Sequence, residues 1–82
     1  MLYYVYILKS EKDLGYYVGC TKNTQDRLSR HKRGLVTSTK YRLPVNLVYC
    51  ESYVTLSEAR LRENKIKSYK GGNEFKKIVS KV

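Results

Sequence analysis

The architecture of this chain is set by residues 2–20, which read LYYVYILKSEKDLGYYVGC. Aromatic and β-branched residues dominate two runs, Leu2 to Lys9 and Tyr16 to Cys20, and such residues favour strands. Between these runs, the segment from Glu11 to Gly15 has the acidic residues and the glycine that are typical of a turn. The stretch therefore predicts a β-hairpin with a loop of several residues.

After the hairpin, the pattern predicts a short basic helix and a third strand. Asn23 is placed to cap a helix over Thr24 to Arg33, and Gly34 suits the position after its end. The segment from Leu35 to Arg42 is a polar and basic loop. Val45 to Cys50 follows a proline and has the composition of a strand.

Two further helices are expected in the last third of the chain. Thr55 and Glu58 match a capping box that opens a helix running to about Lys70, before two glycines. Apolar residues then recur at the spacing of a last amphipathic helix: Phe75, Ile78, Val79 and Val82. The predicted order is β-β-α-β-α-α, which is an α+β fold.

Size and charge limit what the chain does. With 82 residues it has material for one modest core, so we expect a single domain over 1–82. Seventeen Lys and Arg residues against seven Asp and Glu residues give a net charge of +10, more than solubility requires. A polyanionic partner, nucleic acid, is the leading explanation, and a merely basic surface with no specific partner is the alternative.

Membrane association and disulfide bonding are both disfavoured by the sequence. No apolar run approaches the ~20 residues that span a bilayer, and the first eight residues lack the features of an export signal. We therefore expect a cytoplasmic protein with no membrane partner. Cys20 and Cys50 each end a predicted strand, where we expect small reduced core residues rather than a disulfide.

Glu63 is the most informative single residue. Leu56, Ala59 and Ile66 mark the inward side of the capped helix, and Glu63 falls on the same side by +4 and +3 steps. Because glutamate is rarely buried unless it is paired or binds a metal, some positive group is expected beside it. The alternatives are an ion pair with Arg27, Arg60 or a lysine, and a metal ion. The other six acids are interpreted as turn, cap or solvent residues: Glu11, Asp13, Asp26, Glu51, Glu58 and Glu74.

The composition of acids and histidine narrows the choice of metal. A single carboxylate suits Mg²⁺, which keeps several waters and takes substrate phosphate oxygens as further ligands. A two-metal nuclease needs several carboxylates, and a zinc site needs more than the lone His31 without CxxC or HExxH spacing. If a metal binds, one Mg²⁺ or Mn²⁺ ion is expected.

Cations and tyrosines supply the other candidate groups. Arg27 and His31 are four residues apart and share a helix face, although each taken alone is more often a surface residue. Nine tyrosines are present, but only about one in a thousand is ionised at neutral pH, so a tyrosine acting as a base needs help from nearby cations. Candidates for that help and for contacts to the nucleic-acid backbone are Lys9, Lys22, Arg30, Arg33, Lys40 and Arg42.

Five of these features together resemble a known family. Tyr4-Val5-Tyr6, Tyr17-Val18-Gly19, Arg27, His31 and Glu63 follow one another as in the GIY-YIG nuclease superfamily. The chain looks most similar to its short stand-alone branch, where Glu63-x-x-Ile66-Lys67 also has a counterpart. The first triplet departs from the family name, because Tyr4 stands where the name has glycine.

The resemblance implies a fold, a reaction and residue roles. The expected fold is a three-stranded antiparallel sheet flanked by helices, and the expected reaction is phosphodiester hydrolysis with one divalent metal. Tyr6 or Tyr17 would activate or position the attacking water, and the sequence does not decide which. Arg27 would stabilise charge on the phosphoryl oxygens, His31 would support a tyrosine, and Glu63 would hold the metal.

Three functions remain open from the sequence. The resemblance favours an endonuclease acting on DNA, with RNA as an alternative substrate. A non-catalytic basic module that binds nucleic acid through the same fold is the second reading. A protein-interaction adaptor is the third, and it leaves Glu63 unexplained.

Overall fold

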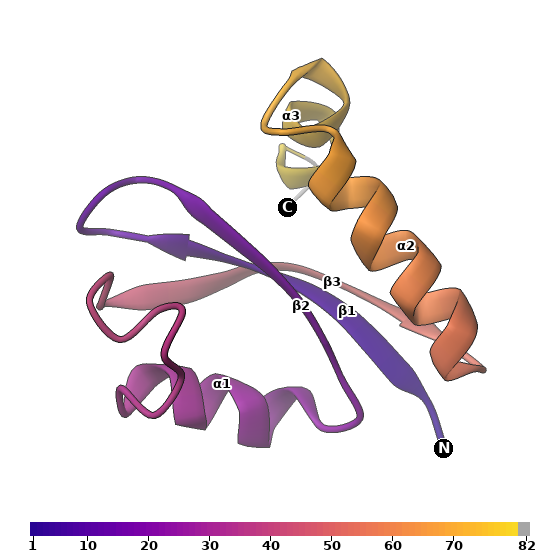
Figure 1. Ribbon diagram of the computed structural model, residues 1–82, viewed down its shortest axis with the longest axis horizontal. Helices are drawn as coiled ribbons and strands as arrows, with labels where there is room; N and C mark the ends of the chain where they lie inside the picture. Colours follow the sequence, from indigo (N-terminus) through magenta and orange to yellow (C-terminus); the bar gives the residue numbers. More distant parts are fainter. Residues whose placement is uncertain (81–82) are drawn as a thin grey trace.

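Three antiparallel strands form one sheet with the order β2-β1-β3 in the computed structural model, which describes residues 1–80 (Figure 1). The strands are β1 (Tyr3–Ser10), β2 (Tyr16–Thr21) and β3 (Val45–Tyr53). Both β2 and β3 pair with β1 in the antiparallel sense, so β1 is the central strand. The predicted hairpin, third strand and fold class are confirmed.

The helices are α1 (Thr24–Lys32), α2 (Leu56–Ser68) and α3 (Asn73–Val79). The side chains of Asn23 and Thr55 cap α1 and α2 by accepting hydrogen bonds from backbone N–H groups of the first turn, as predicted. α3 begins differently, because Gly72 takes the cap position without a side-chain hydrogen bond. Asn73 is thus the first residue of α3 and not its cap. Val82, which we placed on the same helix, lies outside the described residues.

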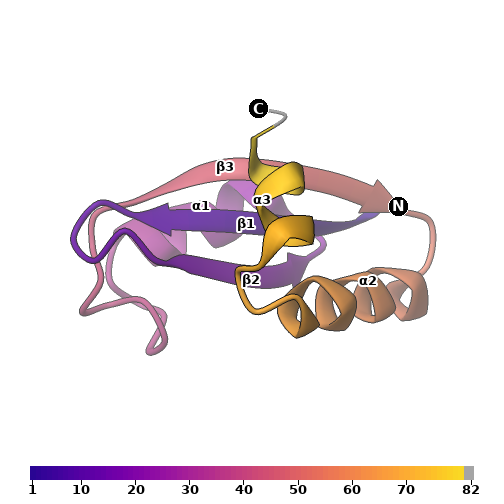
Figure 2. The same cartoon turned by 90° about the horizontal axis from the view of Figure 1, so that it is seen from above.

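The helices pack on opposite faces of the sheet, which is why the central strand is buried on both sides (Figures 1 and 2). Side chains alternate along a strand. Val5 and Ile7 of β1 pack with residues of α2 and α3, whereas Tyr6 and Leu8 pack with Leu28 of α1. The larger core consists of Val5, Ile7, Val18, Ala59, Ile66, Phe75 and Ile78.

Two apolar predictions are wrong in detail. The sequence predicts that Leu28 on α1 and Leu35 just past its end form an apolar anchor, but Leu35 is 62% exposed, and Leu43 from the following loop packs beside Leu28 instead. Leu56, assigned to the inward side of α2, is 38% exposed, while Ala59 and Ile66 are fully buried. The buried stripe of α2 therefore begins one turn later than predicted. Within residues 1–80, no helix combines the length and apolarity needed to cross a membrane.

Candidate active site

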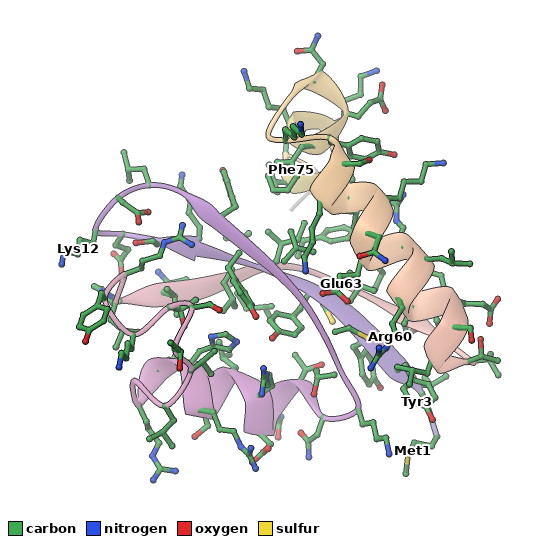
Figure 3. All side chains as sticks on the ribbon, in the orientation of Figure 1. Met1, Tyr3, Lys12, Arg60, Glu63 and Phe75 are labelled. Carbon is green, nitrogen blue, oxygen red and sulfur yellow. The ribbon has the colours of Figure 1, made fainter. Side chains whose placement is uncertain are left out.

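A polar pocket of about 440 Å³ lies where β2 forms the edge of the sheet. It is lined by Tyr6 of β1, Tyr17 of β2, Arg27 of α1 and Glu63 of α2. Because α1 and α2 cover opposite faces of the sheet, these groups meet across the edge strand. Figure 3 shows Glu63 and Arg60 extending from α2 toward β2. Four of the five predicted catalytic residues thus line one pocket.

Gly19 makes this meeting across β2 possible. It lies opposite Tyr6 in the β1–β2 pairing, and the Tyr6 ring occupies the space above it. A Cβ atom at Gly19 would come within 2.9 Å of Cε1 of that ring and closer still to the phenol end. The glycine is therefore needed for the close approach of the Tyr6 ring.

Tyr6 is the centre of a buried hydrogen-bond chain. Its Oη lies 3.0 Å from Nε2 of His31, and Nδ1 of the same imidazole lies 2.7 Å from Oγ1 of Thr39. His31 and Thr39 are both fully buried. His31 therefore lies behind Tyr6 rather than in the pocket, and it is not the partly exposed surface residue that a lone histidine usually is. Thr39 was missed, because nothing in its loop sequence distinguishes it from the neighbouring Thr37 and Ser38.

Arg27 also contacts the Tyr6 oxygen. Its Nε donates a hydrogen bond to Oη over 3.4 Å, and this contact raises the pKa of the guanidinium above its ordinary value. Burial raises the pKa of Tyr6, with the Arg27 hydrogen bond acting in the opposite direction. The phenol therefore keeps its proton at neutral pH. The rest of the guanidinium is available to an anion that enters the pocket.

Glu63 is mostly buried, with 18% of its side chain exposed, and its Oε2 accepts a hydrogen bond from Nζ of Lys67 at 2.8 Å. Of the two alternatives left open by the sequence, the ion pair with a lysine is present. This ion pair uses only one of the two carboxylate oxygens, because no hydrogen bond to Oε1 is found within residues 1–80. In the same range, no group of three or more His, Cys, Asp and Glu side chains could form a complete protein cage for a metal. One accessible carboxylate suits an ion that takes most of its ligands from water and phosphate.

Among the predicted backbone-binding cations, Lys22 lines the pocket. Arg60 of α2 lines it too, although we considered it only as a partner of Glu63. Arg33 forms the C-cap of α1, and Nζ of Lys40 lies 4.9 Å from the ring centroid of Tyr41. Positive charge therefore borders the pocket on both the β2 and the α2 side.

Two other predicted cations are held by acids on the surface. Arg30 pairs with Asp26 at 3.1 Å within α1, and both side chains are more than half exposed. Arg42 pairs with Asp13 of the hairpin loop at 2.8 Å and lowers the pKa of that carboxyl to about 2. Arg42 thus links the two loops at the end of the sheet, and its role in binding nucleic acid stays a prediction.

The interpretation of Glu51 as a solvent residue is wrong. Its carboxylate accepts hydrogen bonds from the hydroxyl groups of Tyr49 and Tyr53, at 2.6 and 2.7 Å, and from Nε of Arg62 at 2.7 Å. Burial acts to raise the pKa of Glu51, but these hydrogen bonds outweigh it and lower the pKa. The network joins β3 to α2, and Glu51 pairs with Val5 of β1 in a strand three residues longer than predicted.

The cysteines are both free, as expected, but only one of them is close to the core. Cys20 is partly buried and packs against the larger core, whereas Cys50 is exposed. The prediction that both are core residues is therefore wrong for Cys50. Since β3 is an edge strand, Cys50 lies on a part of the sheet that is only partly covered.

The stability of the fold should depend on pH through His31. Burial, together with the nearby Arg27, lowers the pKa of His31 below its ordinary value of 6.5. The unfolded chain therefore takes up a proton first as the pH falls below about 6.5, which favours unfolding by up to about 1.4 kcal/mol per pH unit. We expect the free energy of unfolding of the wild type to fall more between about pH 7.5 and pH 5 than that of His31→Gln. Urea unfolding at several pH values measures both, and parallel curves would contradict the buried neutral imidazole.

Comparisons with known proteins agree with the geometry. The sequence model of the family described as the GIY-YIG catalytic domain matches residues 2–76 of this chain. UPF0213 proteins of Staphylococcus aureus strains Mu3 and N315 are each 46% identical over 68 residues, covering 82% of this chain and 82% of the relative. The solution NMR structure of a UPF0213 protein from Bacillus halodurans superposes with a TM-score of 0.62 at 30% identity, covering 98% of this chain and 84% of that one. The match spans the hairpin, both helices that line the pocket and the strand between them, and the chain belongs to the GIY-YIG family.

Proposed function

We propose that this protein is a metal-dependent endonuclease that hydrolyses phosphodiester bonds in nucleic acid, with DNA as its main substrate. The observation that carries the proposal is the meeting of Tyr6, Tyr17, Arg27 and Glu63 in one pocket at the sheet edge. A phenol, a guanidinium and a carboxylate are the groups needed to handle a proton, stabilise phosphoryl charge and hold a cation. Membership of a nuclease superfamily supports the same reaction.

Glu63 would hold one divalent ion, Mg²⁺ or Mn²⁺. Its side chain lines the pocket, and its partner Lys67 is half exposed, so the ammonium group can move into solvent and leave the carboxylate to the ion. When bound, such an ion supplies Lewis-acid stabilisation of the phosphoryl oxygens. Lys67 would then be free to approach the phosphate backbone of the substrate.

Tyr6 is assigned as the residue that takes the proton of the attacking water. If His31 donates its Nδ1 proton to Thr39, its Nε2 lone pair faces the Tyr6 hydroxyl. Tyr6 can then accept a proton from water while it passes its own proton to Nε2. This relay needs no phenolate at rest, which removes the obstacle that the ordinary pKa of tyrosine poses. The lowered pKa of His31 keeps the imidazole neutral at rest, so that its Nε2 can accept a hydrogen bond from the Tyr6 hydroxyl.

Arg27 and Tyr17 complete the site in different ways. The Arg27 guanidinium lies beside the Tyr6 oxygen, where it would stabilise negative charge on the phosphoryl group under attack. Tyr17 packs with its ring centroid 5.0 Å from that of His31 and 6.4 Å from that of Tyr6. Tyr17 would therefore position the water and the imidazole rather than take the proton.

The two tyrosines can be separated by removing each hydroxyl. We expect Tyr6→Phe to lower kcat by roughly 10²-fold, the typical lower range for loss of a proton-transfer group. Tyr17→Phe should lower kcat by less than about tenfold, because the Tyr17 hydroxyl makes a weaker contact with Arg27 than the Tyr6 hydroxyl does and has no partner in the His31 chain. Single-turnover cleavage at saturating metal measures both variants. Equal losses, or a larger loss in Tyr17→Phe, would contradict the assignment of Tyr6.

The reaction itself is tested by a cleavage panel. Labelled single-stranded, duplex and branched DNA and RNA are incubated with the protein in Mg²⁺, in Mn²⁺ and in EDTA. Product is expected with either ion and not with EDTA, and more from DNA than from RNA. If no substrate is cut while binding weakens steeply with salt, the protein is a basic nucleic-acid-binding module instead.

A further inference from the structure

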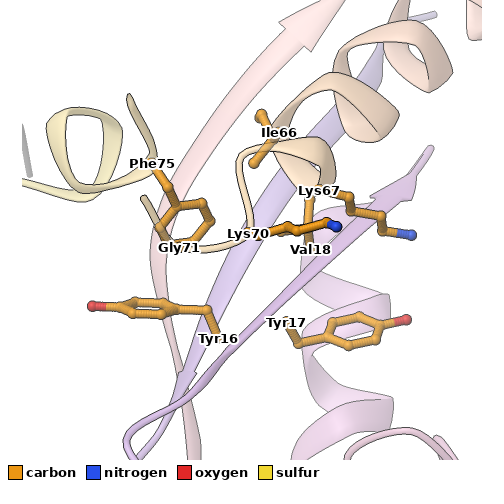
Figure 4. Close-up of a pocket in the computed structure, with 8 residues that line it drawn as sticks. All are labelled: Tyr16, Tyr17, Val18, Ile66, Lys67, Lys70, Gly71 and Phe75. Atoms are coloured by element: carbon orange, nitrogen blue, oxygen red, sulfur yellow. The ribbon is translucent and has the colours of Figure 1, made fainter. Parts of the chain in front are cut away.

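A second pocket, of about 380 Å³, lies next to the candidate active site, between β2 and the end of α2 (Figure 4). We call it the Tyr16 pocket; its main lining residues are Tyr16, Tyr17, Val18, Ile66, Lys70 and Phe75. Val18, Ile66 and Phe75 are buried core residues, so the floor is apolar and rigid. A pocket of this size and character suits one small planar group.

An aromatic ring forms one wall of the Tyr16 pocket. The Tyr16 ring meets Phe75 edge-to-face, with centroids 4.9 Å apart and planes at 66°, which fixes its orientation. Tyr16 is still 36% exposed, although Nζ of Lys9 lies 5.7 Å from its ring centroid. An exposed aromatic ring held in place in this way is a platform for a nucleobase, because every base has a π-face that stacks regardless of sequence.

Positive charge borders the same pocket and favours an anionic occupant. Lys67 and Lys70 line it, and none of its lining residues within the described chain is acidic. With a net charge of +10 on the whole chain, a nucleotide fits this surface better than an apolar or basic peptide does.

The Tyr16 pocket adjoins the candidate active site, and two side chains link the two pockets. Tyr17 lines both pockets, and Lys67 of the Tyr16 pocket pairs with Glu63 of the active-site pocket at 2.8 Å. A strand whose phosphate lies beside Arg27 and Glu63 therefore has a neighbouring place for the base of an adjacent nucleotide.

We propose that the Tyr16 pocket receives one unpaired base next to the phosphate that is cut, an assignment that rests on the proposed function. A base in a duplex must be unstacked and unpaired before it can enter such a pocket, whereas a bulged, flapped or single-stranded base enters at little cost. The apolar side chains of the floor cannot form hydrogen bonds with the edge of a base, so they do not distinguish one base from another. The protein therefore prefers nucleic acid with an unpaired base at the site of cleavage, without preference for which base it is.

Binding in EDTA tests this assignment without cleavage. The probes are a duplex DNA and the same duplex with one unpaired 2-aminopurine, whose fluorescence falls when the base stacks on an aromatic ring. Tyr16→Leu should weaken binding of the unpaired probe by roughly tenfold and restore its fluorescence, because stacking on one aromatic ring is worth about 1–3 kcal/mol. Binding of the plain duplex should change little. Lys70→Gln, at an exposed turn, should also weaken binding of the unpaired probe.

The matched control is a second tyrosine that also has a lysine beside its ring. Tyr41 is 74% exposed, with Nζ of Lys40 over its ring, and Tyr41 does not line the Tyr16 pocket. Tyr41→Leu should leave the fluorescence of the unpaired probe unchanged. Circular dichroism confirms that each variant is folded, and Lys70→Gln carries the test if Tyr16→Leu does not fold.

The outcomes separate this assignment from the proposed reaction. If Tyr16→Leu weakens binding of the plain duplex and of the unpaired probe equally, or leaves both affinities unchanged, the assignment is overturned. This holds whether or not the protein cuts DNA. If Tyr16→Leu selectively loses binding of the unpaired probe but the cleavage panel yields no product, the pocket is a base-binding site and the proposed hydrolysis fails.

Discussion

Glu63→Gln is expected to reduce metal-dependent cleavage by roughly 10³-fold or more, because loss of the cation removes several kcal/mol of charge stabilisation. Glutamine keeps the size of the side chain at a position that is 18% exposed, so the fold should persist. The measurement is the single-turnover rate at increasing Mg²⁺ and Mn²⁺. Partial recovery at very high metal concentration would agree with a weakened site.

Glu74→Gln is the matched control for Glu63→Gln. It makes the same change of charge on α3, at a side chain that is 63% exposed and pairs with Lys77. We expect a wild-type rate from it. A wild-type rate in Glu63→Gln as well would place the activity in another site or in a contaminant.

Arg27→Ala is expected to lower kcat by about 10²–10³-fold, the range found when one group that stabilises transition-state charge is removed. Arg27→Lys should recover only part of this loss, because an ammonium group lacks the planar fork of the guanidinium. Nearly all of the effect should fall on kcat, since the interaction is strongest in the transition state.

Arg30→Ala provides the control on the same helix. Arg30 lies on the exposed surface of α1 and pairs with Asp26, so its loss should weaken binding slightly and leave kcat near wild type. If Arg27→Ala and Arg30→Ala behave alike, Arg27 acts only through the general positive charge of the surface.

Local signals in the sequence predict most of the secondary structure. Strand composition, Asn23 and the Thr55 capping box each act over a few residues, and each is found where expected. The last part of β3 is not predictable in this way. Glu51 to Tyr53 are held as a strand by pairing with Tyr3, Tyr4 and Val5, about 50 positions earlier in the chain, which local composition does not reveal.

The residues of the candidate site also fall into two groups: those that local sequence signals predict and those that depend on contacts between distant segments. Glu63 could be predicted because an acid on the inward side of a helix interrupts an apolar pattern. The burial of His31 depends on the loop that carries Thr39, and the partners of Glu51 come from β3 and α2. Nothing in the sequence of either segment indicates which other segment it contacts, so these contacts are seen only in the folded chain.

Tyr6, Arg27 and Glu63 line one pocket, and we propose that Glu63 holds the divalent ion there. Paramagnetic Mn²⁺ broadens NMR signals near its binding site, so its titration into ¹⁵N-labelled protein locates that site without any substrate. We predict broadening confined to amides around the pocket, with Gly19 and Glu63 among them, and its loss in Glu63→Gln. Broadening that centres on another part of the chain, or that persists unchanged in Glu63→Gln, would contradict the claim.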